Sequence, residues 1–128
     1  MNLNLLSNHY QVRRMTTNDI PLIYGLCIQN QRYYDYYPPL VTKQSIASDL
    51  NALPHGVNKK DKYYLGFFDQ AHLIAVMDLI SGYPEKDTAY LGFFMVDKQT
   101  QNQGVGSLII NELSLFLKVN NFKYIKLC

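Results

Sequence analysis

Residues 101–106 read Gln101-Asn102-Gln103-Gly104-Val105-Gly106, and they join an apolar run typical of a strand to an apolar run with helical periodicity. The two glycines allow the backbone to come close to a ligand, and the helix that follows presents unpaired N–H groups and the positive end of its dipole. Together these features bind phosphate groups. The stretch therefore predicts a phosphate-binding loop between a strand and a helix.

The residues after the glycines exclude two nucleotide-binding loops. A P-loop needs Lys and then Ser or Thr after its last glycine, whereas Gly106 is followed by Ser107 and Leu108. The Rossmann fingerprint needs a third glycine three residues after the second, and Ile109 occupies that position. The loop therefore predicts a phosphate-bearing ligand of another kind.

Periodicity and turn residues predict the elements around the loop. A first helix is expected after Thr16–Asp19, with Pro21 tolerated in its first turn, and a second helix is expected after the cap residue Thr42. The inward face of the second helix is predicted to be Ile46, Leu50 and Leu53. The predicted strands are Tyr10–Met15, Tyr63–Phe68, Leu73–Ile80, Thr88–Val96 and one that begins at Phe122, with a third helix after the glycines.

The composition indicates a single globular α/β domain over residues 1–128, because 48% of the residues are apolar and the net charge is only +2. There is no run of Lys or Arg, so neither nucleic acid nor a membrane surface is an expected partner. Cys27 and Cys128 are expected to be free thiols in a reducing cytoplasm. The three histidines lack metal-ligand spacing, and no metal site is expected.

The segment from Leu91 to Ile110, with its Gln-x-x-Gly-x-Gly signature, resembles the acetyl-CoA binding motif of the GCN5-related N-acetyltransferase (GNAT) family. The predicted order of elements also resembles that fold. The resemblance implies an α+β fold with a mixed, mostly antiparallel central sheet flanked by helices. It also implies that the C-terminal helix and the last two strands are missing after Cys128, either because the chain is a fragment of a longer protein or because it is a short member completed by another chain. The unpaired sheet edge is expected to support a homodimer.

The resemblance implies acetyl-CoA as the cofactor and assigns its binding residues. The pyrophosphate would lie on the backbone of the loop, and the pantetheine arm would pair with the strand before it. The implied cofactor residues are Phe94, Met95, Val96, Gln101, Asn102, Gln103, Gly104, Val105, Gly106 and Ser107. The N–H of Val96 would also stabilise the negative charge that develops on the thioester carbonyl, an effect worth about 3 kcal/mol in comparable sites.

Proton transfer has two candidate residues. Some members of the family place a glutamate six residues before the valine that corresponds to Val96, and here that position is Tyr90. Asp78 is the alternative base, because a carboxylate in an apolar strand has a raised pKa. Asp78 can equally be a solvent-facing residue of a half-exposed strand. The family's usual general acid, a tyrosine on a helix after the last strand, has no counterpart before Cys128.

A tyrosine-rich segment, in which Pro38 and Pro39 prevent continuous helix, is the expected acceptor site. Its implied substrate-binding residues are Tyr33, Tyr34, Asp35, Tyr36 and Tyr37, with aromatic faces and a carboxylate to attract an ammonium group. The same rings can instead pack over the edge of the core. The expected function is transfer of acetyl to the primary amine of a small molecule or peptide, by direct attack of the amine on the thioester. One alternative is a non-catalytic CoA-binding module with a regulatory or interaction role, and another is an α/β interaction domain without a cofactor.

Overall fold

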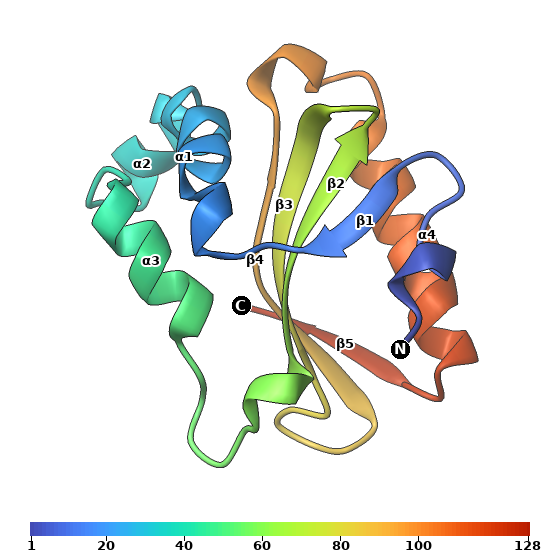
Figure 1. Ribbon diagram of the computed structural model, residues 1–128. Coiled ribbons are helices and arrows are strands. Elements are labelled where there is room, and N and C mark those ends of the chain that lie inside the picture. The colour runs from blue at the N-terminus through green and yellow to red at the C-terminus, as the bar shows by residue number, and fades with distance from the viewer.

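The computed structural model describes residues 1–128, and its frame is a five-stranded sheet in the order β1-β2-β3-β4-β5 (Figure 1). The strands are β1 (Gln11–Arg14), β2 (Lys62–Asp69), β3 (His72–Ser81), β4 (Thr88–Val96) and β5 (Tyr124–Leu127). The pairs β1–β2, β2–β3 and β3–β4 are antiparallel, and β5 runs parallel to β4. The predicted mixed, mostly antiparallel α+β fold is confirmed.

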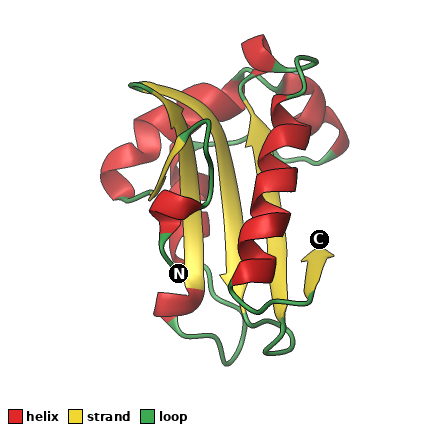
Figure 2. Cartoon of the chain, turned by 90° about the vertical axis from the view of Figure 1, so that its right-hand side faces the viewer, coloured by secondary structure: helices red, strands yellow, loops and turns green.

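Helices cover both faces of this sheet. The helices are α1 (Ile20–Ile28), α2 (Gln31–Tyr36), α3 (Lys43–Asn51) and α4 (Val105–Val119). The first three lie together on one side of the sheet, and α4 lies across the other side (Figures 1 and 2). None of the helices has both the length and the apolar content that a membrane crossing requires.

The local sequence explains where the helices begin. Pro21 lies in the first turn of α1, where its missing N–H costs nothing. The hydroxyl of Thr42 accepts the N–H of Ser45 at 2.9 Å and caps α3 as predicted. The inward face of α3 is shorter than predicted, because the helix ends at Asn51 and Leu53 is exposed. The helix α2 was not predicted, and it ends at Tyr36, just before the two prolines.

Strand alternation divides the buried residues into two cores. The core under α4 contains Leu65, Phe67, Met77, Ile109 and Leu113, all fully buried. The core under α1 and α3 is formed by a second set, Met15, Ile23, Leu26, Cys27, Val41, Ile46, Tyr64, Phe68, Leu73, Val76 and Met95. Because β4 contributes to both cores, its position between the two helical layers is fixed.

The whole of β5 pairs with β4, but only the first four residues of β4 take part in this pairing. Their register runs from Thr88 opposite Tyr124 to Leu91 opposite Leu127. A register shift in the β3–β4 ladder follows at Gly92, and beyond it β4 pairs with β3 alone. The side of β4 that faces away from β3 over residues 93–96 is called the open edge below.

Candidate cofactor and acceptor site

The connection from β4 to α4, residues 101–107, forms the phosphate loop. Asn102 and Gly104 both adopt the left-handed backbone conformation, with φ of 66° and 80°. The N–H of Gln101 donates to Lys98 O at 3.3 Å, and the next N–H along the chain to find a backbone acceptor is that of Leu108, which donates to Gly104 O at 3.0 Å. The N–H groups of residues 103–107 donate to no group of the protein. Consecutive free N–H groups at a helix start are the arrangement that binds a phosphate.

The two glycines of the phosphate loop serve different purposes. Gly104 has a φ of 80°, and a Cβ built on it would meet nothing within 4 Å. Its role is therefore conformational, since left-handed backbone strains other residues. A Cβ on Gly106 would lie 3.8 Å from Cγ2 of Val96 and 3.9 Å from Cε2 of Phe94, which is ordinary contact. The bare face of Gly106 therefore looks toward the end of β4.

The backbone at the end of β4 alternates between β3 and the open edge. Asp97 faces β3, because its N–H donates to Ile74 O at 2.7 Å. By the alternation of an antiparallel ladder, Met95 also faces β3, whereas Phe94 and Val96 face the open edge. Of the three residues predicted to pair with pantetheine, Met95 therefore has its backbone groups turned toward β3 and away from the open edge.

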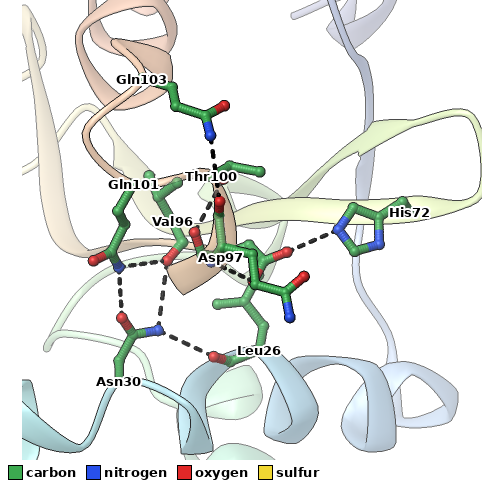
Figure 3. Close-up of polar contacts among 9 residues, drawn as sticks. Leu26, Asn30, His72, Val96, Asp97, Thr100, Gln101 and Gln103 are labelled. Atoms are coloured by element: carbon green, nitrogen blue, oxygen red, sulfur yellow. Dashed lines mark hydrogen bonds and ion pairs between the residues drawn. The ribbon is translucent and has the colours of Figure 1, made fainter.

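The carbonyl of Val96 is already occupied within the protein. It accepts the side-chain amide of Gln101 at 2.9 Å and that of Asn30 at 3.5 Å (Figure 3). The N–H of Val96 is left on the open edge. Gln101, predicted to bind cofactor, has its side-chain nitrogen turned toward the strand, where it also donates to Asn30. This amide holds the loop against β4 instead of pointing into solvent.

The sequence interpretation gave no role at this site to three residues, which are Asp97, His72 and Asn30. Asp97 is buried, and its Oδ2 lies 2.8 Å from Nε2 of His72. Its Oδ1 accepts the N–H of Gln99 at 3.3 Å and so caps a short 3-10 turn, Lys98–Thr100. Asn30 is the third. Neither Asn30 nor His72 belongs to a local motif, and only the polar Asp97 directly after an apolar strand offered a signal.

A groove of about 770 Å³ runs beside the open edge. We call it the acceptor groove, and its lining residues are Asn30, Gln31, Arg32, Tyr33, Tyr36, Tyr37, Phe94, Met95, Val96, Lys98 and Gln101. The ring of Tyr33 packs against Tyr37 and, edge-on, against Phe93, at 5.0 and 5.9 Å between centroids. The fold thus brings part of the tyrosine-rich segment next to the strand predicted to bind cofactor.

Tyr34 and Asp35 do not line this groove. Tyr34 is half-buried and turned toward Cys27. Its pKa is raised mainly by burial and also by the neighbouring thiol of Cys27. Asp35 is exposed and makes no side-chain hydrogen bond. The charged side chains that do line the groove are Arg32 and Lys98, both cations. The expected carboxylate for an ammonium group is therefore not found in the groove.

Asp78 lies opposite Phe93 on the α1–α3 side of the sheet and is tied to another residue. Its Oδ2 is 3.1 Å from Nζ of Lys62, which also donates to Ala52 O, and its Oδ1 is buried without a partner. Burial raises the pKa of Asp78, and the ammonium of Lys62 opposes that rise. With its side chain only 20% exposed, Asp78 is not the solvent-facing residue of the alternative interpretation.

Tyr90 lies near the paired end of β4, where it is opposite Lys126 of β5. Its ring packs edge-on against Tyr83, with 5.4 Å between centroids. A hydrogen bond with Cys128, more than burial, raises the pKa of Tyr90. Neither Tyr90 nor Asp78 lines the acceptor groove.

Comparison with known proteins gives a consistent result. Residues 28–128 match the family model described as the acetyltransferase (GNAT) family. Among solved structures, an acetyltransferase from Thermus thermophilus has a TM-score of 0.71 at 20% identity, over 83% of this chain and 68% of that one. The ribosomal-protein-S18-alanine N-acetyltransferase from Escherichia coli has a TM-score of 0.65 at 16% identity, over 92% and 65%.

A third similar structure is the PaiA N-acetyltransferase from Thermoplasma acidophilum in complex with coenzyme A. Its TM-score is 0.63 at 13% identity, over 92% of this chain and 77% of that one. No curated protein sequence matches the chain. The chain thus spans about two thirds to three quarters of these three structures.

Proposed function

The chain belongs to the GNAT acetyltransferase family, and on that premise we propose that it transfers acetyl from acetyl-CoA to a primary amine, as a single domain over residues 1–128. The observation that carries the proposal is the run of free N–H groups at residues 103–107, next to residues 93–96 of β4, which pair with β3 alone. A phosphate-bearing ligand with an extended arm fits both features. The acetyl-CoA thioester supplies the activated acetyl group when bound.

Residues of the phosphate loop and β4 hold this ligand in the proposal. The N–H groups from Gln103 to Ser107 take the pyrophosphate, and the backbone of Phe94 and Val96 pairs with the pantetheine arm. The N–H of Val96 is the donor for the carbonyl oxygen that gains negative charge, worth about 3 kcal/mol. Gln101 contributes by keeping the carbonyl of Val96 occupied, so that only the N–H of Val96 is offered to the ligand.

The acceptor amine enters the acceptor groove between Tyr33, Tyr36 and the open edge. No carboxylate lines this groove, whereas Arg32 and Lys98 do. Nearby positive charge disfavours an ammonium and lowers the pKa of an amine. The groove therefore favours the neutral amine that attack requires. Asp78, with its raised pKa, is the proposed final proton acceptor, and because it does not line the groove, the proton has to reach it through intervening water.

A non-catalytic CoA-binding module is the second candidate function. It is favoured by the ion pair that ties Asp78 to Lys62 and by the lack of any carboxylate in the groove. Such a module binds coenzyme A and acetyl-CoA but transfers acetyl to no amine. Turnover of acetyl-CoA with a panel of amines, compared with binding alone, separates the two functions.

Location and assembly also belong to the proposal. Cys27 and Cys128 are free thiols, in keeping with a reducing cytoplasm. The outer strand β5 carries Tyr124 and Leu127, which are 62% and 68% exposed. Pairing of this strand with a second copy is the proposed route to a homodimer.

Titration of coenzyme A into matched glycine variants tests the proposed site. Gly104→Ala and Gly56→Ala both place a Cβ on left-handed backbone, at φ of 80° and 82°, with nothing within 4 Å. Each is expected to lose about 1–2 kcal/mol of stability. Gly104→Ala is expected to weaken coenzyme A binding at least tenfold in calorimetry, while Gly56→Ala, between α3 and β2, keeps it. Equal binding by the two variants would show that the loop does not hold the pyrophosphate.

A further inference from the structure

Asn30 lies between α1 and α2, and its side chain reaches three parts of the fold (Figure 3). The residue is only 8% exposed. Its Nδ2 donates to Leu26 O at 3.1 Å and to Val96 O at a longer 3.5 Å. Its Oδ1 accepts the side-chain amide of Gln101. One amide group thus contacts the end of α1, the end of β4 and the phosphate loop.

The peptide unit that follows Val96 is held on both sides of the strand. Its carbonyl oxygen accepts Gln101 and Asn30, and its N–H, which belongs to Asp97, donates to Ile74 O at 2.7 Å on β3. Because a peptide unit is planar, fixing both of its polar ends fixes its orientation. The orientation of this unit in turn restricts how far the preceding N–H of Val96 can rotate away from the open edge.

Asn30 also adjoins the opposite wall of the acceptor groove. The next residues, Gln31, Arg32 and Tyr33, form the start of α2 and line the groove. All hydrogen bonds of the Asn30 side chain are with the protein, so its amide is used to join elements. A buried polar network that is fully satisfied makes a local structure rigid.

We infer that Asn30 is a positioning residue that keeps the Val96 N–H, the phosphate loop and the acceptor wall in a fixed relative arrangement. The inference rests on the proposed function and deepens it, because it concerns how the donor strand is aligned with the acceptor. Asn30 acts through Gln101 and Val96 and does not contact the reacting atoms. Displacement of a reacting group by about 1 Å can cost about 10²-fold in rate, so a loosened clamp affects turnover more than binding.

Three variants and one matched control test the inference. Asn30→Ala removes the clamp, Gln101→Ala removes its partner at an exposed position, and the double variant removes both. Asn120→Ala is the control, because Asn120 Nδ2 also donates to a carbonyl four residues earlier, Phe116 O at 2.8 Å, but at the end of α4. The readouts are the exchange rate of the Asp97 amide and the Gln101 side-chain NMR signals, coenzyme A affinity by calorimetry, and acetyl-CoA turnover with an amine panel.

Asn30→Ala is expected to increase the hydrogen-exchange rate of the Asp97 amide at least tenfold. It is also expected to move the chemical shifts of the Gln101 side-chain amide to the values of a solvated amide. It is expected to lower kcat about 10- to 100-fold while the Kd for coenzyme A changes by less than about threefold. The double variant is expected to be no worse than the poorer single variant, as for two residues that act together. Gln101→Ala carries the same test if Asn30→Ala does not fold.

The results distinguish the inference from the proposed function. If Asn30→Ala has the same exchange rate of the Asp97 amide and the same kcat as the control Asn120→Ala, the positioning role is wrong. If the wild-type protein fails to bind coenzyme A, the proposed function is wrong. In that case the exchange of Asp97 and the signals of Gln101 still decide whether Asn30 clamps the strand.

Discussion

The imidazole Nε2 of His72 lies 2.8 Å from Oδ2 of Asp97 and links the start of β3 to the end of β4 (Figure 3). The carboxylate side chain is only 6% exposed, whereas the histidine side chain is 60% exposed. The other carboxylate oxygen caps the turn that leads into the phosphate loop. The buried carboxylate of Asp97, beside the phosphate loop, thus depends on the exposed side chain of His72 for its closest side-chain partner.

His72→Ala removes that partner and leaves the Asp97 carboxylate buried with one weak donor. We expect a loss of about 1–3 kcal/mol in urea unfolding and a several-fold weaker affinity for coenzyme A, since the turn before the loop loses its anchor. His72→Gln retains a donor and is expected to restore part of both. The control is His55→Ala, at an exposed histidine between α3 and β2 that makes no side-chain hydrogen bond. Equal stability of His72→Ala and His55→Ala would contradict the role given to this pair.

Lys62→Met leaves Asp78 as a half-buried carboxylate without its cation. Since burial already raises the pKa of Asp78 and Lys62 opposes the rise, loss of Lys62 raises that pKa further. A carboxyl group with a raised folded-state pKa contributes stability below its ordinary pKa of 3.8, and this stability is lost as pH rises through the folded value. The variant is therefore expected to lose about 3 kcal/mol near pH 7.5 and clearly less near pH 4.5.

Urea unfolding at the two pH values measures this difference. Lys59→Met, at an exposed lysine nearby, is the control and is expected to show little change at either pH. The double variant Lys62→Met/Asp78→Leu removes both charges and is expected to recover most of the stability at pH 7.5. A loss for Lys62→Met that does not depend on pH would mean that the lysine stabilises by packing and by its hydrogen bond to Ala52 O, and not through Asp78.

Arg32 gives the acceptor groove part of its positive charge, so acceptors with a carboxylate next to the amine are expected to be preferred over polycationic amines. Arg32→Glu is expected to shift the ratio of kcat/KM for lysine over cadaverine toward cadaverine by about fivefold, as for an exposed charge worth about 1 kcal/mol. Lys86→Glu, in the exposed turn between β3 and β4, makes the same change in net charge away from the groove. An unchanged ratio in Arg32→Glu, or an equal shift in Lys86→Glu, would show that Arg32 does not select the acceptor.

The elements that local chemistry specifies were predictable from the sequence. Pro21 and Thr42 mark the starts of two helices through rules that act within one turn. The strand that ends at Val96 and the glycines after it were predictable as a unit, because the pattern of a phosphate loop lies in one short stretch of sequence. The short helix α2 was not, since its six residues carry tyrosines that favour no single element.

The contacts that organise the candidate site were not predictable in the same way. Gln101 and Asn30 are separated by 71 positions, and nothing near either residue indicates the other. The same holds for Lys62 and Asp78, which only the register of β2 and β3 brings together. Asp35 was assigned to the acceptor site together with its tyrosine neighbours, but it is exposed and does not line the groove.

The open edge of β4 has a consequence for the solubility of the protein. An unpaired strand edge recruits strands from other molecules and promotes aggregation. In this chain, the recruiting edge from Phe93 to Val96 is the surface on which the acetyl donor is proposed to lie. Engineering that closes the edge with proline or an added strand, to keep the protein monodisperse, would therefore close the donor site as well. The backbone groups that would recruit a foreign strand at this edge are the same ones that would bind a strand-like ligand, whereas the proposed homodimer uses the outer edge of β5.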